Sequence, residues 1–296
     1  MNAVIPLAQA TTADSGPKMG RLGELIRRGG QVPDGFVITA AAAAVPDAEL
    51  AAEIAAAYGR LCGDDPQPVA VRSSAVDEDG EGASFAGVYE SFLGLVGVEK
   101  IVPAVRACWA AARSERATGY RERMGGGDPA ASPMAVGVML MVPARSSGVV
   151  FTVDPVTGRN DRYVIEATTG FGEPVVQGVV TPDRIEVSAE DGRVLRYEPG
   201  DKRIALRYSG GQMSRVELSA EEARTPALSE QEVGVLYESV RAVRELAGHQ
   251  VDCEWVIDQS GRAWIVQWRA VTALPSDDEL DWDPAEYAAR YAFRSG

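Results

Sequence analysis

The sequence predicts an α+β protein, and three observations lead to this prediction. Helical and strand-like stretches are mixed along the chain without the strict strand–helix–strand alternation of a parallel α/β sheet. Of the 296 residues, 46% are hydrophobic and 24% are charged, which is an ordinary globular composition for two cores or one large core. A strong hairpin signal lies near the end of the chain. We expect an N-terminal lobe (1–142), a C-terminal lobe (143–276) and a helical tail or linker (277–296).

The N-terminal lobe begins with small and polar residues (1–17), to which we assign no element. Leu22, Leu25 and Ile26 then recur at helical spacing, which predicts a short amphipathic helix starting near Lys18. A glycine-containing loop before a helix that carries a lysine can bind phosphate through backbone N–H groups. A solvated lysine at the start of a helix is the plainer interpretation of the same pattern.

Further elements of this lobe follow in order. They are a turn and strand (32–39), an alanine-rich helix interrupted at Pro46 (40–62), a strand ending in Arg72 (69–72), a helix (98–124) and an apolar strand (134–142). The last run suits a strand that is buried on both faces. Residues 73–91 are too rich in glycine and polar residues for a regular element. Long loops of this kind are functional lids or mobile surface loops.

The C-terminal lobe contains most of the predicted strands. We expect a turn (143–148), three strands (149–154, 163–167 and 184–187), one or two strands within 194–208, and a helix (229–247). Ser229 and Glu232 have the spacing of a capping box, which places the start of that helix.

Residues 251–269 predict a β-hairpin, because two alternating apolar runs flank the turn-forming residues 258–261. Side chains alternate between the two faces of a strand. One face then carries four polar side chains: Asp252, Glu254, Gln267 and Arg269. The other face is predicted to be core: Val251, Cys253, Trp255, Trp264, Val266 and Trp268. A two-residue turn places Asp252 opposite Gln267 and Glu254 opposite Ile265, and a bulge or a longer loop would change this register.

Two carboxylates, an amide and a guanidinium on one surface suggest a specific chemistry. Oxygen ligands suit Mg²⁺, and an arginine beside them suits phosphate oxygens. An antiparallel sheet with one solvated polar face would show the same pattern without a ligand. The hairpin alone therefore leaves both interpretations open.

Charge and composition exclude several classes of function. A formal net charge of −14 argues against a nucleic-acid partner, which needs a basic footprint. The single histidine, His249, excludes a His-based zinc site or a catalytic triad within the chain. Cys62, Cys108 and Cys253 lack CxxC spacing and fit reduced thiols of a cytoplasmic protein. The N-terminus has no secretory pattern and no run has the length of a membrane helix, so we expect no membrane partner.

Several distinctive motifs occur in order between about Gly16 and Thr272. They are Lys18–Leu25, Val32–Val37, Val71–Ala75, Glu78-Asp79, Ala83–Gly87, Ser147–Pro155, Gly170–Glu173, Val176–Gly178, Pro182-Asp183, Lys202–Ala205, Asp252–Trp255 and Gln267–Arg269. Together they resemble the N-terminal ATP-binding domain of the phosphoenolpyruvate synthase, pyruvate phosphate dikinase and rifampicin phosphotransferase family. The resemblance implies an ATP-grasp-like fold whose two lobes hold Mg·ATP, with a glycine-rich lid at about 76–91.

The resemblance also implies roles for single residues in the N-terminal lobe. Lys18 and Arg72 would bind the phosphates of ATP, and Arg72 would stabilise the transition state. Gly87 and Ser91 would belong to the lid over the triphosphate.

In the hairpin, the resemblance implies that Glu254 and Gln267 hold Mg²⁺ (or Mn²⁺). Asp252 and Arg269 would orient ligands and phosphates, so that Lys18, Arg72 and Arg269 are the expected catalytic cations. Three places depart from the family pattern: Pro17 replaces a glycine, Met139 replaces a glutamine beside the adenine, and Gly80–Gly82 replaces a Leu-Pro segment of the lid. These departures concern nucleobase preference and lid behaviour.

Full-length relatives add a swivelling domain with a phosphate-accepting histidine, and His249 lacks the sequence context of that residue. We therefore expect a nucleotide-binding subunit that transfers a phosphoryl or pyrophosphoryl group from ATP to a histidine on a separate carrier protein. The alternatives are a direct small-molecule kinase or ATP-grasp-type ligase, a non-catalytic nucleotide-binding module, and a domain excised from a longer protein.

Overall fold

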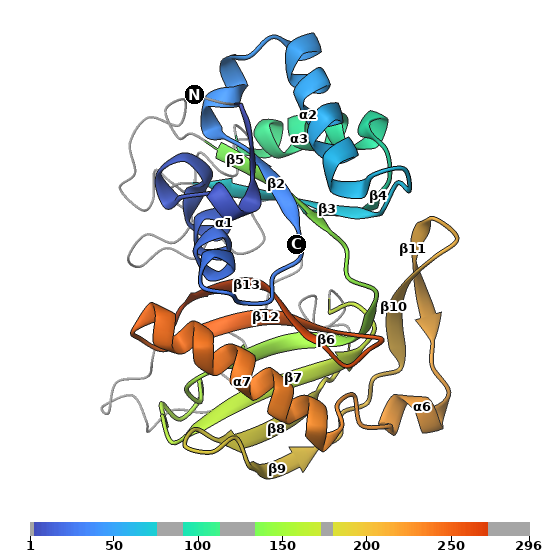
Figure 1. Cartoon of the computed structure of the whole chain (residues 1–296). Helices are drawn as coiled ribbons and strands as arrows, with labels where there is room; N and C mark the ends of the chain where they lie inside the picture. The colour runs from blue at the N-terminus through green and yellow to red at the C-terminus, as the bar shows by residue number, and fades with distance from the viewer. Residues whose placement is uncertain (1–2, 76–90, 113–133, 173–179, 272–296) are drawn as a thin grey trace. The chain divides into compact units, whose positions relative to one another are not determined.

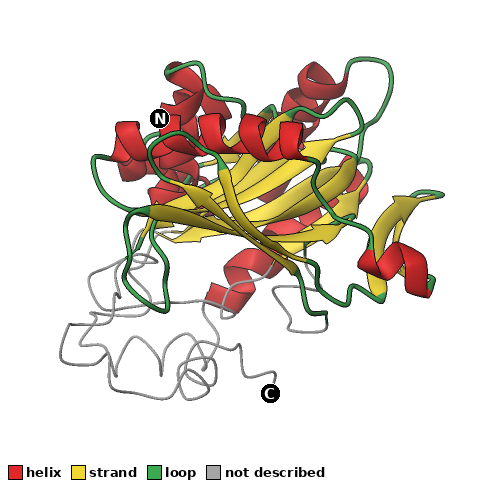
Figure 2. Ribbon diagram, turned by 90° about the horizontal axis from the view of Figure 1, so that it is seen from below, coloured by secondary structure: helices red, strands yellow, loops and turns green. Residues whose placement is uncertain are grey.

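A computed structural model describes residues 3–75, 91–112, 134–172 and 180–271. The chain divides into two compact units, Met1–Met141 with Gly210–Gln212, and Val142–Ser209 with Met213–Gly296. Each unit is built on its own main sheet, as Figure 1 shows, and Figure 2 shows helices packed against the strands. The predicted α+β class is therefore confirmed. In the described residues, no helix combines the length and the apolar character needed to cross a membrane.

The sheet of unit 1 is antiparallel throughout and has the order β1-β2-β5-β3-β4 in the described residues. Its strands are β1 (Val4–Pro6), β2 (Gly35–Ile38), β3 (Val69–Ala75), β4 (Ser91–Leu95) and β5 (Met134–Leu140). The apolar run predicted as a fully buried strand is the central strand β5, whose residues are buried from Met134 to Met139.

Helices cover both faces of this sheet. One face packs on α2 (Asp47–Cys62) and α3 (Val98–Ala112), forming a core that includes Val71 and Val138. The other face packs on α1 (Thr12–Arg27), where Met19 is fully buried over β5. Two short 3₁₀ helices, η1 (Leu7–Gln9) and η2 (Ala40–Ala44), complete the unit.

Residues 3–17 are structured, although no element was assigned to this region from sequence. Strand β1 pairs with β2, and a capping box of Thr11 and Asp14 starts the first turn of α1. A three-residue strand has too short a pattern to be detected locally, and pairing with β2 defines it instead. The predicted helix near Lys18 is confirmed, because α1 is kinked at Gly16 and its longer segment begins there.

The sheet of unit 2 is also antiparallel in its described part, with the order β13-β12-β6-β7-β8-β9. Its strands are β6 (Ala144–Phe151), β7 (Arg162–Thr169), β8 (Asp183–Ser188), β9 (Val194–Glu198), β12 (Val251–Asp258) and β13 (Ala263–Ala270). A separate ribbon of β10 (Ile204–Ser209) and β11 (Gln212–Glu217) leads into the short helix α6 (Ala220–Arg224). The turn predicted at 143–148 is wrong, because residues 144–148 belong to β6, and residues 146–148 pair with both β12 and β7.

Helix α7 (Glu230–Ala247) packs on this sheet along β12 and β13 (Figure 1). Its start is the predicted capping box, in which the N–H of Ser229 donates to Glu232 at 2.8 Å and the N–H of Glu232 donates to the Ser229 hydroxyl at 3.3 Å. Its end is Gly248, in the left-handed conformation with φ 72°. The ring centroids of Tyr163 on β7 and Tyr237 on α7 are 5.4 Å apart, so α7 covers the face of the sheet that carries Tyr163.

A fully buried ion pair joins Asp183 of β8 to Lys202, which precedes β10. The same carboxylate accepts hydrogen bonds from the Tyr197 hydroxyl at 2.8 Å and from the backbone N–H groups of Gly200 and Ala227 at 2.7 Å each. Asp183 therefore ties together β8, β9 and the connection into α7. Both residues belong to family motifs, Pro182-Asp183 and Lys202–Ala205, to which the resemblance assigns no role.

Candidate functional site

In unit 1, the segment that carries Lys18 is docked on strand β3. Gly16 has φ 69°, and a Cβ atom there would lie 2.6 Å from the Ser74 carbonyl oxygen. The backbone N–H of Met19 donates to the Ser74 hydroxyl at 3.3 Å. Only glycine fits at residue 16, because the backbone is left-handed and the approach to Ser74 is too close for a side chain. This junction fixes the position of the α1 segment that begins with Pro17 and Lys18.

Arg72 lies on the same strand, two residues before Ser74, and therefore on the same face. Its direct cross-strand partners are Ser91 of β4 and Gly137 of β5. A Cβ atom on Gly137 would collide with the sulfur of Met19, so α1 passes directly over this position. The structure thus gathers the Lys18 segment, Arg72 and Ser91 on one face of unit 1. Gly87 and most of the predicted lid (76–90) lie outside the described residues.

Met139 is also on β5, opposite Ala70, and its side chain is 3% exposed. The position that departs from the family pattern is therefore filled by a buried thioether in this chain.

In unit 2, the hairpin is confirmed but its register differs from the predicted one. Asp252 pairs directly with Arg269, and Glu254 pairs with Gln267. Two irregularities cause the difference. The turn has three residues, with Gly261 at φ 82°, and a bulge lies between Glu254 and Trp255.

The corrected register changes which side chains are buried near the turn. Ile265, predicted to face Glu254, lies opposite Trp255 and is 1% exposed. Trp264 and Val266, predicted as core, are only half-buried, and the Trp264 indole N–H donates to Asp258 at 2.8 Å. The burial of Val251, Cys253, Trp255 and Trp268 is confirmed.

The four predicted polar residues share one face of the hairpin as two cross-strand pairs. The Nε of Arg269 donates to both carboxylate oxygens of Asp252, at 2.8 and 3.1 Å. Beside this ion pair, the half-buried Glu254 and Gln267 bring a carboxylate and an amide oxygen to adjacent positions. Mg²⁺ is commonly held by one or two carboxylates together with substrate phosphates, so these donors fit that ion. In the described part of the chain, no group of three or more His, Cys, Asp or Glu residues could hold a metal ion on its own.

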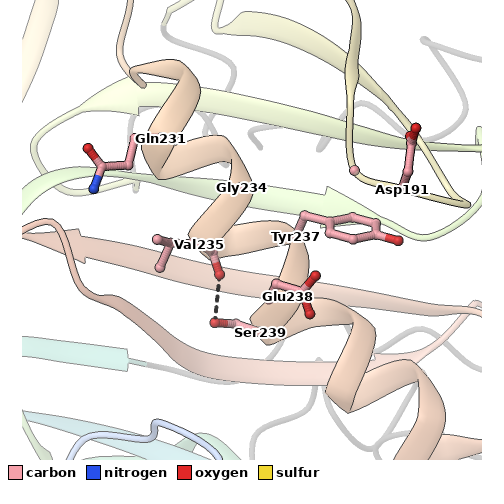
Figure 3. A pocket seen from close by; sticks show the side chains of 8 residues that line it. Asp191, Gln231, Gly234, Val235, Tyr237, Glu238 and Ser239 are labelled. Atoms are coloured by element: carbon pink, nitrogen blue, oxygen red, sulfur yellow. Dashed lines mark hydrogen bonds between the residues drawn. The ribbon is translucent and has the colours of Figure 1, made fainter.

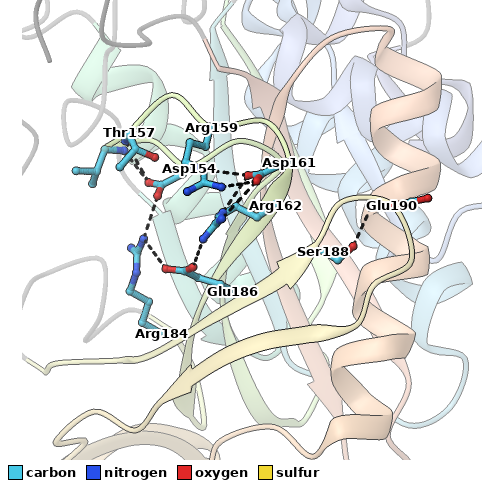
Figure 4. Close-up of polar contacts among 10 residues, drawn as sticks. Asp154, Thr157, Arg159, Asp161, Arg162, Arg184, Glu186, Ser188 and Glu190 are labelled. Atoms are coloured by element: carbon cyan, nitrogen blue, oxygen red, sulfur yellow. Dashed lines mark hydrogen bonds and ion pairs between the residues drawn. The ribbon is translucent and has the colours of Figure 1, made fainter.

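Polar residues continue on this sheet beyond the hairpin. Figure 4 shows Arg184 directed toward Asp154 and Glu186, at 3.5 and 3.7 Å, while Arg162 bonds Glu186 at 2.6 Å. Glu166 on β7 lies directly opposite Arg184 and is half-buried, and burial raises the pKa of its carboxyl group although Arg184 lowers it. Sequence reasoning missed Glu166. Its only signal was a charged residue inside an otherwise apolar strand.

Two other features do not match the predicted chemistry. A shallow hollow along α7 is lined by Asp191, Tyr237, Glu238 and neighbouring residues, with no lysine or arginine, and therefore does not suit a triphosphate (Figure 3). His249 is exposed, and its Nδ1 lies 3.0 Å from the carbonyl oxygen of Gln250.

Unit 1 carries Lys18 and Arg72, and the hairpin of unit 2 carries two carboxylates paired with a guanidinium and an amide. These side chains are of the types expected in a nucleotide-binding domain. The family described as pyruvate phosphate dikinase, AMP/ATP-binding domain, matches residues 42–286. The chain belongs to this family, which confirms the resemblance drawn from its motifs.

Two relatives illustrate the extent of the match. The probable phosphoenolpyruvate synthase of Methanothermobacter thermautotrophicus is 34% identical over 304 residues, covering 88% of this chain and 44% of the relative. The rifampicin phosphotransferase of a Streptomyces species is 34% identical over 315 residues, covering 93% of this chain and 36% of the relative. The chain thus spans less than half the length of these relatives.

Solved structures give a weaker likeness. D-alanyl-alanine synthetase A from Vibrio cholerae matches over 92% of this chain and 61% of its own, with 12% identity and a TM-score of 0.40. The family assignment does not depend on this comparison.

Proposed function

We propose that this chain is the nucleotide-binding part of a dikinase-like phosphotransferase with an ATP-grasp-like fold. It binds ATP with Mg²⁺ (or Mn²⁺) and transfers a phosphoryl or pyrophosphoryl group to a histidine on a separate carrier protein or domain. Membership of the ATP-binding family supports nucleotide binding. The names of the relatives, phosphoenolpyruvate synthase and rifampicin phosphotransferase, support phosphotransfer. A cytoplasmic location fits three cysteines that form no disulfide.

The observation that carries the proposal is the pairing on the hairpin. Glu254 and Gln267 are adjacent oxygen donors, and Asp252 fixes the guanidinium of Arg269 beside them. In this proposal, Glu254 and Gln267 bind Mg²⁺, which would neutralise charge on the phosphates. Arg269, oriented by Asp252, contacts a phosphate oxygen, for which its planar fork of donors is well suited.

Unit 1 supplies the remaining cations. Lys18 and Arg72 bind the phosphates, and Arg72 stabilises the charge that develops on the transferred group. Ser91, directly opposite Arg72, and Gly87 contribute to the lid. Positioning and charge neutralisation account for most of the catalysis of phosphoryl transfer, so a mobile histidine carrier needs no further base from this chain.

The test is to incubate the protein with Mg²⁺, a histidine-carrier domain and ATP labelled at either the β- or the γ-phosphate. Formation of AMP with label from both positions on the histidine indicates pyrophosphoryl transfer. AMP with only the β-label on the histidine, and the γ-label released as phosphate, indicates the same transfer followed by hydrolysis of the terminal phosphate. ADP with the γ-label on the histidine indicates phosphoryl transfer. Glu254→Gln should abolish labelling. Glu198→Gln serves as the matched control, because Glu198 lies at the far edge of the same sheet.

Other products would replace the proposal by one of its alternatives. ADP together with a phosphorylated small molecule or an amide product indicates a direct kinase or an ATP-grasp-type ligase. Binding of ATP without turnover, with any carrier, indicates a non-catalytic module.

A further inference from the structure

Strand β7 carries two polar side chains, Glu166 and Thr168, that make no hydrogen bond to any of the described residues. In the described part of the chain, the Glu166 carboxylate makes no hydrogen bond and no ion pair, since Arg184 opposite it is engaged with Asp154 and Glu186. Two residues further along, Thr168 is fully buried, and its hydroxyl likewise has no partner among these residues. Side chains two apart on a strand share a face, so both groups point the same way.

Unpartnered polar groups are costly inside a protein. Buried polar atoms are nearly always hydrogen-bonded, and a group left without a partner costs its full desolvation energy. Burial also raises the pKa of Glu166, which shows that the fold holds this carboxyl group in an unfavourable setting. Buried polar groups of this kind are found most often in binding sites, where a ligand supplies the missing hydrogen bonds.

Register places these groups on the face of the sheet that carries the proposed metal ligands. Glu254 lies directly opposite Val149 on β6, and Val149 lies directly opposite Glu166 on β7. Directly opposed residues share a face, so Gln267, Glu254, Val149 and Glu166 form one row across four strands. Neighbouring strands are about 4.8 Å apart, which puts Glu166 about 10 Å from Glu254 along this row.

Charge decides which part of ATP suits this position. A carboxylate repels phosphates and, being an acceptor, needs hydrogen-bond donors. The hydroxyl groups of ribose are donors, and a separation of about 10 Å from Glu254 leaves room for phosphates between the metal site and the sugar. The half-buried Val149 provides an apolar surface along the way.

We propose that Glu166 and Thr168 bind the nucleoside half of ATP, with the Glu166 carboxylate accepting hydrogen bonds from the ribose hydroxyls. This inference rests on the proposed function, which places the metal and the triphosphate at the hairpin. Glu166 and Thr168 are then the part of the site that distinguishes a ribonucleotide from a nucleotide without sugar hydroxyls.

The test compares the binding of Mg·ATP and Mg·2′,3′-dideoxy-ATP by calorimetry in the wild type, Glu166→Ala and Thr168→Val. The wild type should prefer ATP by about tenfold or more, since hydrogen bonds to a charged group are strong. Glu166→Ala should bind the two nucleotides equally. Thr168→Val should bind ATP more weakly than the wild type. Glu198→Ala is the matched control and should keep the full preference, because Glu198 lies in the same row at the outer strand β9.

Thermal unfolding provides a second readout that does not depend on the nucleotide. Glu166→Ala and Thr168→Val should unfold at the wild-type temperature or above, because each removes a group that has no hydrogen bond to the described residues. A lower unfolding temperature for both variants would mean that the two side chains stabilise the fold, and would overturn the inference.

Binding outcomes separate this inference from the proposed function. The inference alone is overturned if the wild type binds ATP and Glu166→Ala still prefers ATP to the dideoxy nucleotide. It is also overturned if Glu166→Ala loses affinity for both nucleotides by the same factor. A wild type that binds neither nucleotide overturns the proposed function together with the inference.

Discussion

Replacing Lys202 by methionine should destabilise unit 2 by about 3 kcal/mol. Lys202 and Asp183 are both completely buried, and removing one partner of a buried ion pair costs about 3–5 kcal/mol because the other charge stays without compensation. The Asp183 carboxylate keeps three other donors, the Tyr197 hydroxyl and the N–H groups of Gly200 and Ala227. These donors continue to stabilise the charge, so the lower end of that range applies.

Urea unfolding followed by tryptophan fluorescence measures this loss, because three of the five tryptophans (Trp255, Trp264 and Trp268) lie in the hairpin of unit 2. The matched control is Arg203→Met at the adjacent residue. Arg203 pairs with Asp201, and both side chains are more than half exposed, so the free energy of unfolding should change by less than about 0.5 kcal/mol.

A double variant separates the ion pair from the packing of the lysine chain. Lys202→Met combined with Asp183→Asn removes both charges and should be more stable than Lys202→Met alone. A loss below about 1 kcal/mol for Lys202→Met, or no recovery in the double variant, would refute the argument that an uncompensated carboxylate is the source of the instability.

Three further variants test the proposed site. Arg72→Ala should lower the turnover rate by about 10³-fold or more while the circular dichroism spectrum stays unchanged, and a normal rate would remove Arg72 from the mechanism. Glu254→Ala should weaken Mg·ATP binding by about tenfold or more in a calorimetric titration, and an unchanged titration would remove it from the metal site. Gly16→Ala should cost more stability than Gly29→Ala. Both glycines have positive φ, but only Gly16 lies against Ser74, so the comparison by urea unfolding isolates that collision, and equal losses would contradict it.

The fold class and the residue types of the hairpin could be predicted from sequence, because both depend on local patterns. Alternation of apolar and polar residues marks a strand regardless of its partner, and a capping box such as Ser229 with Glu232 is a local signal. The family resemblance, carried by ordered motifs, is confirmed by the match over residues 42–286. The roles of single residues remain proposals.

Register could not be predicted, because it depends on backbone conformation that the pattern does not encode. A serine–glycine turn is compatible with two or three loop residues, and the left-handed Gly261 selects three here. The bulge beside Glu254 adds a second shift of one residue. Glu166 escaped notice for a related reason. Its significance comes from a row across four strands, and no such row exists before the sheet is assembled.

The bulge in the hairpin decides which side chains of β13 face α7 beyond Ile265. Each of its two one-residue irregularities exchanges the inner and outer sides of β13, and the second reverses the effect of the first. Without the bulge, the same three-residue turn would pair Cys253 with Gln267 and Val251 with Arg269, so these two polar side chains would point toward α7 and Trp268 would be exposed to water. Deletion of Val266 leaves Trp255 opposite Ile265 and Glu254 opposite Gln267, so a homologue that lacks only this residue should keep the polar face of the hairpin and its nucleotide binding.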